Sequence, residues 1–88
     1  MSNLNHEQAK ALQMAYAATL ATIQSAGPDG APSGVVYAAL MTYGCTLNQF
    51  QSLTQGMEKQ GHINFNDLKF TITHKGSETL ARLEQILN

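Results

Sequence analysis

Charged side chains are scarce in this chain of 88 residues, where Asp, Glu, Lys and Arg together make up 12% of the sequence. That is about half the usual share. The formal net charge is −1, so the chain has no general attraction to phosphate, acidic lipid or acidic substrates. Its surface must therefore be completed by Gln, Asn, Ser and Thr, or be covered in part by another subunit.

Cysteine and long apolar runs are also nearly missing. The single cysteine, Cys45, excludes an internal disulfide and is typical of a reducing cytoplasm. No apolar run is long enough to span a membrane, and Met1 leads directly into polar residues rather than into a signal peptide. We therefore expect a cytoplasmic protein without membrane contact.

Side chains that could perform catalysis or bind a metal are present but are not arranged for either task. Asp29 and Asp67 occupy predicted turns, where the backbone preference of aspartate explains them. His6, His62 and His74 lack the spacing of metal ligands, so surface or structural roles fit them better. Because no nucleophile can be paired with a base, we predict that the chain is not an enzyme and uses no metal or cofactor.

The chain does have enough apolar residues for one small core. Hydrophobic residues make up 43% of the sequence, which is typical of a globular rather than a disordered chain. Since the usual domain contains about 100–150 residues, we expect a single domain over residues 1–88.

Four segments combine helix caps with apolar residues at helical spacing. Asn5 is the predicted N-cap of the first segment, and a Gly-Pro-Asp-Gly loop ends it. Thr46 and Gln49 form a capping box for the third, and Thr73 caps the last. The predicted helices cover residues 5–26, 33–43, 46–60 and 74–87.

The residues at helical spacing in the first three helices are expected to face the core. They are Leu12, Tyr16, Leu20 and Ile23, then Val36, Ala39, Leu40 and Tyr43, and finally Leu47, Phe50, Leu53 and Met57. Gly56, inside the third helix, costs about 1 kcal/mol relative to alanine. Close approach by another helix would explain this glycine, and so would a relaxed helix end, since Gly61 is only one turn away; we expect packing rather than function to be the reason.

A three-residue turn, 44–46, separates the second helix from the third and is typical of a helix-turn-helix. Gly44 is the expected left-handed cap of the second helix. Two interpretations of Cys45 stay open. It is either a small buried hydrophobic residue beside Phe50 or a redox-sensitive thiol.

A β-hairpin is predicted directly after the third helix. Asn66 and Asp67 tolerate the positive φ angles of a type I′ turn, so we expect them to be its two turn residues. In that register the large apolar residues share one face of the hairpin. The expected pairs are Phe65 with Leu68, Ile63 with Phe70, and Gly61 with Ile72.

The two motifs Met57-Glu58-Lys59-Gln60-Gly61-His62-Ile63 and Phe70-Thr71-Ile72-Thr73-His74-Lys75-Gly76 carry a family resemblance. They resemble the Leu-x-x-x-Gly-x-Ile and Leu-Thr-x-x-Gly motifs of winged-helix domains in small bacterial and archaeal regulators related to MarR and PadR. The resemblance implies an α+β, mainly α fold. In such a fold a helix-turn-helix carries a short two-stranded wing, and the N- and C-terminal helices are long.

The resemblance further implies a dimeric, double-stranded-DNA-binding transcriptional regulator whose third helix enters the major groove. Gln and Asn can bond adenine bidentately, and Ser can contact several bases. Glu58 and an acidic wing tip at Asp67 reduce the positive charge that such proteins usually carry. The candidate DNA-binding residues are Asn48, Gln51, Ser52, Gln55, Lys59, Lys69 and Lys75.

A second apolar stripe lies on nearly the opposite side of helix 5–26 from the expected core face. One apolar face is enough for so small a core, so the second predicts a partner helix, most simply from another copy. Alanine's high helix propensity is the alternative explanation. The candidate dimer-interface residues are Ala11, Met14, Ala18 and Ala21, supported by helix 74–87.

A different functional class is also consistent with the sequence. The near-neutral charge, the short acidic wing tip and the second apolar stripe suit a winged-helix protein-protein interaction module that does not bind nucleic acid.

Overall fold

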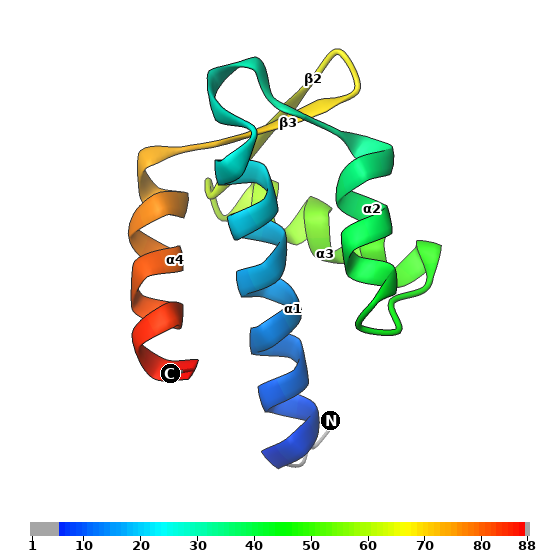
Figure 1. Cartoon of the computed structure of the whole chain (residues 1–88), viewed down its shortest axis with the longest axis vertical. Helices are drawn as coiled ribbons and strands as arrows, with labels where there is room; N and C mark the ends of the chain where they lie inside the picture. The colour runs from blue at the N-terminus through cyan, green and yellow to red at the C-terminus, as the bar shows by residue number, and fades with distance from the viewer. Residues whose placement is uncertain (1–5, 88) are drawn as a thin grey trace.

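Four α-helices and a small antiparallel sheet form the fold in the computed structural model, which describes residues 6–87 (Figure 1). The elements are α1 (His6–Ser25), the 3-10 turn η1 (Gly27–Asp29), β1 (Ala31–Pro32), α2 (Ser33–Met41), α3 (Leu47–Lys59), β2 (Ile63–Asn66), β3 (Lys69–Ile72) and α4 (His74–Leu87). The expectation of an α+β, mainly α fold with a wing-like hairpin is confirmed. The predicted N-cap, Asn5, lies outside the described residues.

Helices α1 and α4 run antiparallel beside each other, and the sheet lies at the end where α1 finishes and α4 begins (Figure 1). Every helix and the sheet contribute buried apolar side chains to one core. The largest fully buried apolar side chains are Leu20, Ile23, Val36, Leu40, Met57 and Ile63.

Three apolar residues that we expected in the core are instead about half exposed. They are Leu12 (51%), Tyr43 (49%) and Leu47 (50%). Helix α2 ends at Met41, so Tyr43 lies in the following turn rather than on its inner face. Leu12 and Leu47 lie in the N-terminal parts of their helices, which the rest of the described chain leaves partly uncovered. Cys45 is half-buried and packs against the core, in agreement with the interpretation as a small hydrophobic residue.

The hairpin is present, but its turn is one residue further along than predicted. Asp67 and Leu68 occupy the turn with φ angles of 52° and 63°. The observed pairs are Ile63 with Ile72, Asn64 with Thr71, Phe65 with Phe70, and Asn66 with Lys69. Moving the turn by one residue leaves the same side chains on each face, so the apolar alternation did not distinguish the two registers. The observed one pairs Phe65 with Phe70, whose ring centroids are 4.6 Å apart.

A third strand, which was not predicted, joins the hairpin along its β3 edge. In β1, Ala31 pairs with Phe70 and Pro32 pairs with Lys69, so the strand order is β1-β3-β2. The expected two-stranded wing is therefore a three-stranded sheet. A two-residue strand that contains proline carries too little pattern to be recognised from sequence.

Two glycines in the helices have opposite environments. Gly56 of α3 is exposed, and a Cβ added there would meet nothing within 4 Å, so the expected close approach of another helix is wrong for this chain by itself. Gly76 of α4 is buried, and a Cβ there would overlap the carbonyl group of His62 and lie 2.9 Å from Ile72 Cγ1. The helical glycine that makes a close contact is therefore Gly76, where α4 approaches the backbone of His62.

Candidate functional site

The outward face of α3 is the candidate site, and both ends of this helix are held by hydrogen bonds. At its start, Gln49 N–H donates to Thr46 Oγ1 (3.2 Å) while Thr46 N–H donates to Gln49 Oε1 (2.8 Å). The predicted capping box is thus confirmed. At its end, Gly61 has a φ of 79°, and the N–H groups of Gly61 and His62 donate to the carbonyls of Glu58 and Met57. This is a Schellman motif, which satisfies the last carbonyls of the helix.

Five of the predicted DNA-contacting residues share the solvent side of α3. Its opposite side buries Phe50, Thr54 and Met57 in the core. Within residues 6–87 the five side chains make no hydrogen bond or ion pair, so all their polar groups are available to a partner. The five exposed residues are Asn48, Gln51, Ser52, Gln55 and Lys59.

The other two predicted contact residues lie outside α3, and only one of them is close to it. Lys75, at the start of α4, runs beside the turn that ends α3, since its Cδ is 3.9 Å from the position of a Cβ built on Gly61. Lys69 lies on the sheet face opposite buried Phe70 and packs beside Gly30. The structure therefore brings Lys75, but not Lys69, toward the end of α3.

The wing tip is unusual in both conformation and polarity. Leu68 has the left-handed φ of 63° that a branched side chain rarely adopts, and it is 74% exposed. Phe65, on the adjacent strand, is 41% exposed. With the neighbouring carboxylate of Asp67, the tip presents an apolar side chain beside a negative charge. The sequence-based prediction placed Leu68 in a strand and so missed its exposure.

His62 connects three helices at the junction between α3 and β2. Its Nδ1 is hydrogen-bonded to the Tyr16 hydroxyl of α1, and its Nε2 lies 3.2 Å from Thr79 Oγ1 of α4. Burial, with a smaller effect from the positive charge of Lys75, lowers the pKa of His62, and burial raises the pKa of Tyr16. Within the described chain, His62 is therefore a structural histidine, one of the two roles that we expected for it.

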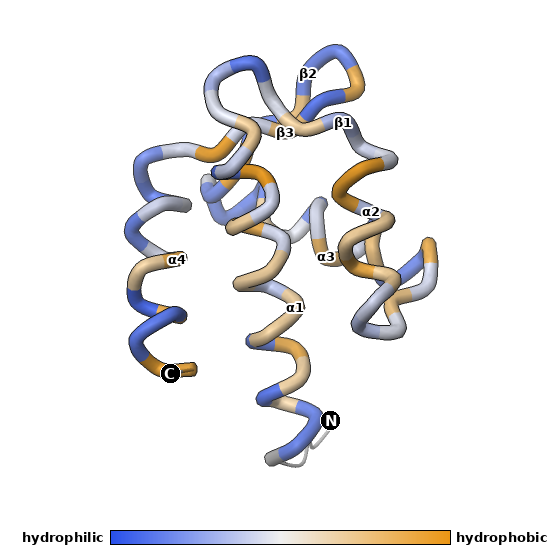
Figure 2. Tube along the Cα trace, viewed as in Figure 1, coloured by the Kyte–Doolittle hydropathy of each residue, from blue (hydrophilic) through white to orange (hydrophobic). Residues whose placement is uncertain are grey.

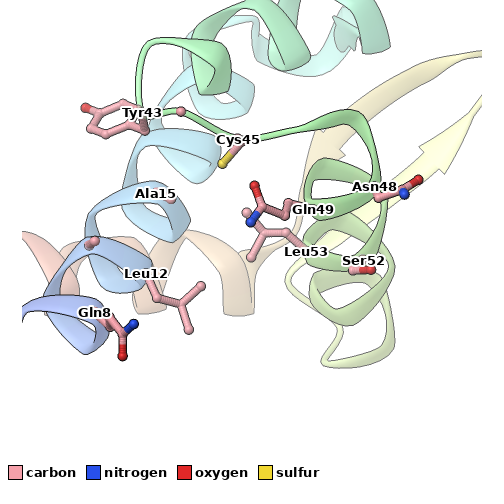
Figure 3. A pocket seen from close by; sticks show the side chains of 11 residues that line it. Gln8, Leu12, Ala15, Tyr43, Cys45, Asn48, Gln49, Ser52 and Leu53 are labelled. Carbon is pink, nitrogen blue, oxygen red and sulfur yellow. The ribbon is translucent and has the colours of Figure 1, made fainter. Parts of the chain in front are cut away.

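A groove of about 620 Å³ separates the N-terminal half of α1 from the start of α3 (Figure 3). Leu12 and Ala15 of α1 lie along one side, and Gln49 and Leu53 of α3 point toward them from the other. Asn48 lies at the edge and points away from the groove in Figure 3. The groove is thus lined largely by apolar groups, and Asn48 remains on the outward face of α3.

The predicted dimer residues are distributed over two grooves. Ala11 lines the groove between α1 and α3, whereas Met14, Ala18 and Ala21 line a second groove of about 490 Å³ between α1 and α4. Ala11 and Met14 are exposed, and the two other alanines are half-buried. The stripe is therefore accessible in the single chain.

Residues 6–87 contain neither a cluster of metal ligands nor a membrane-spanning helix. In that part of the chain, no three His, Cys, Asp or Glu side chains are grouped so that they could hold a metal ion. None of its helices is both long and apolar enough to cross a membrane.

No protein-family model matches the chain, and no curated protein or solved structure matches it. The resemblance to winged-helix regulators therefore stays a prediction from the sequence motifs.

Proposed function

We propose that this chain is a winged-helix DNA-binding protein in which α3 enters the major groove and acts as the sequence-reading helix of a transcriptional regulator. The observation that carries the proposal is the outward face of α3. Gln51 and Gln55 lie one turn apart on it, with exposed side chains that have no internal partner. Glutamine can bond N6 and N7 of adenine together, and the major groove of B-DNA admits an α-helix.

The fixed ends of α3 support the same proposal. The Thr46–Gln49 capping box and the Schellman turn at Gly61 keep the helix regular over its whole length. A reading helix needs this regularity, because base contacts depend on several side chains being presented at once. The capped helix therefore fixes the backbone positions from which these side chains extend.

The charge of the site determines how tightly DNA would be held. Lys59 lies at the end of α3, and Lys75 lies beside the turn that follows it. Each phosphate that a lysine neutralises contributes about 0.9 to the dependence of log K on log salt. Two such contacts give a slope of roughly −2, so we expect weak binding by a single chain that is best measured at low salt.

Fluorescence anisotropy with duplexes selected from a random pool at low salt tests the proposal. The double variant Gln51→Ala/Gln55→Ala should lose discrimination between selected and random duplexes by about 1–3 kcal/mol for each lost base contact. Lys59→Ala should weaken binding to all duplexes and reduce the salt slope by about 1. Gln85→Ala, at an exposed glutamine of α4, is the matched control and should bind like the parent chain. Absence of binding to every duplex at low salt would overturn the proposal.

One observation favours a second candidate, a protein-binding module. The exposed Leu68 beside Asp67 gives the wing an apolar and acidic tip. The carboxylate of this tip is repelled by DNA phosphate, whereas an apolar or basic protein surface would complement the tip. The variant Asp67→Asn separates the two functions. If the wing lies against DNA phosphate, this variant should bind DNA more tightly, because it removes a like charge. If the wing binds a basic protein surface, the same variant should weaken that complex, because it removes an opposite charge.

A further inference from the structure

Strand β2 is an edge of the sheet, and the backbone groups on its outer side have no partner within residues 6–87. Pairs in an antiparallel ladder alternate between hydrogen-bonded and non-hydrogen-bonded. Thr73 N–H donates to the His62 carbonyl over 3.1 Å, so that pair is hydrogen-bonded. Counting along the register from it makes Phe65–Phe70 a non-hydrogen-bonded pair. The N–H and C=O of Phe65 therefore point away from β3, toward the open edge.

The two edges of the sheet differ in their protection against pairing with another strand. At one edge, β1 has two residues, and one of them is Pro32, which has no N–H to donate. At the other edge, β2 has four residues, Ile63–Asn66, without a proline or a charged side chain. Natural proteins usually block such an edge with lysine, proline or a bulge. The β2 edge is therefore open to another strand, whereas the β1 edge is not.

The open edge is also accessible. Asn64, Phe65 and Asn66 are all exposed, and 41% of Phe65 is accessible although its ring packs against Phe70. Figure 2 shows the hairpin at the end of the molecule opposite to the start of α1 and the end of α4, with hydrophilic and apolar residues side by side in it. A strand that approaches β2 from outside therefore meets both free backbone groups and an aromatic side chain.

The sequence of β2 is complementary to itself in one antiparallel register. When Phe65 faces the partner's Phe65, their N–H and C=O groups exchange two hydrogen bonds across a two-fold axis. The two rings then lie on the same face as a cross-strand aromatic pair. On the other face, Asn64 is opposite the partner's Asn66, and neutral amides can donate to and accept from each other. No like charges meet in this register, because Ile63–Asn66 contains no charged side chain.

We infer that β2 pairs antiparallel with β2 of a second copy of this chain and that two three-stranded sheets thereby join into one six-stranded sheet. Both outer edges of this sheet are the short, proline-containing β1, so the assembly closes as a dimer and does not extend into a fibre. The strand pair involves no residue of α1, α3 or α4, so it is a different interface from the helical one that the second apolar stripe predicts. It does not depend on whether the chain binds DNA.

Sedimentation velocity up to millimolar concentrations, without DNA, tests the inference. The parent chain should form a dimer that dissociates on dilution, because a single strand pair buries little surface. Phe65→Pro removes the outward N–H but no hydrogen bond of the hairpin, so it should weaken dimerisation by about tenfold or more. Phe65→Val keeps the N–H and a side chain suited to a strand, so it is the matched control and should still dimerise. A parent chain that is monomeric at every concentration, or equal dimerisation of the two variants, overturns the inference.

Charged side chains on the outer face test the register. Asn64→Lys/Asn66→Lys places like charges opposite each other twice and should weaken dimerisation by about tenfold. Asn64→Lys/Asn66→Glu places opposite charges together twice and should dimerise at least as well as the parent chain. In either neighbouring register one of these positions faces itself in the partner, so the second variant would be weakened as well. Circular dichroism checks that both variants are folded, and equal association of the two contradicts the proposed pairing.

Hydrogen exchange of the parent chain tests the pairing without any substitution. The Phe65 N–H should exchange rapidly in the dilute monomer and about tenfold more slowly at concentrations where the dimer dominates. The Asn64 N–H is bonded within the hairpin, so it is the internal control and should be protected at both concentrations. Exchange at Phe65 that is independent of concentration in a chain that dimerises would show that the dimer forms through another surface.

Discussion

The backbone N–H of Ser33 donates a hydrogen bond to the carbonyl oxygen of Leu68 over 3.0 Å. This bond connects the first turn of α2 to the tip of the wing, and β1 continues the connection by pairing with β3. The wing is consequently held on its β3 side by a segment that is distant in sequence. Leu68 keeps its left-handed backbone within this arrangement.

Leu68→Gly should stabilise the fold by about 1 kcal/mol, because glycine adopts a positive φ without the steric cost that a branched residue carries. The exposed leucine side chain loses little packing in this variant. Chemical denaturation measures the change, with Leu68→Ala as the control that removes most of the side chain but keeps the backbone cost. A loss of stability in Leu68→Gly would mean that the leucine side chain contributes packing.

Gly76→Ala should destabilise the fold by about 3 kcal/mol, since its Cβ overlaps the carbonyl group of His62, which is held by a hydrogen bond from Thr73 N–H. Gly56→Ala is the matched substitution in an open environment, and it should stabilise α3 by about 1 kcal/mol. Thermal unfolding of the two variants measures both effects. Equal effects of the two substitutions would contradict the close contact between α4 and His62.

Stability should fall as the pH decreases through the range in which His62 titrates. The folded pKa of His62 is lowered, whereas the unfolded value is about 6.5. The unfolded chain therefore binds more protons below about pH 6.5, and stability is lost from there down to the lowered folded pKa. Urea denaturation at pH values above and below this range measures the loss.

The variant His62→Gln should flatten this pH dependence. The groups that face His62 are Tyr16 of α1 and Thr79 and Lys75 of α4. A pH profile that is the same with and without His62 would show that another group is responsible.

Thr73→Ala should destabilise the fold by about 1–2 kcal/mol, because the Thr73 hydroxyl acts at two places. It accepts a hydrogen bond from Gly76 N–H (3.0 Å) as the cap of α4, and it donates one to the Gly61 carbonyl (2.6 Å). Thr73→Ser keeps the hydroxyl and should retain most of the stability in the same denaturation experiment. If serine and alanine behaved alike, the hydroxyl would not be the stabilising group.

The features that sequence predicted correctly are those whose partners are close in the chain. Thr46 and Gln49 cap α3 across three residues, and Thr73 caps α4 across three residues, so the local pattern contains both partners. The outward face of α3 follows in the same way from the 3.6-residue period. Its exposure could therefore be predicted, although its binding partner could not.

The features that sequence did not predict depend on contacts between distant segments. The turn at Asp67–Leu68 is preferred over Asn66–Asp67 in a sheet that includes β1 and the hydrogen bond from Ser33. Neither contact leaves a pattern within the hairpin itself. The need for glycine at position 76 depends in the same way on the carbonyl of His62, which the periodicity of α4 does not reveal.

Four aromatic rings form a continuous row from α2 through α3 to the sheet. The centroid distances are 5.1 Å for Tyr37–Phe50, 6.2 Å for Phe50–Phe70 and 4.6 Å for Phe65–Phe70. Each ring shifts the magnetic resonance frequencies of its neighbours, so a displacement of the hairpin by a bound molecule should change the proton spectrum of Phe50, the ring that faces Phe70 of β3. The domain thus contains an intrinsic NMR reporter of wing movement that needs no attached label.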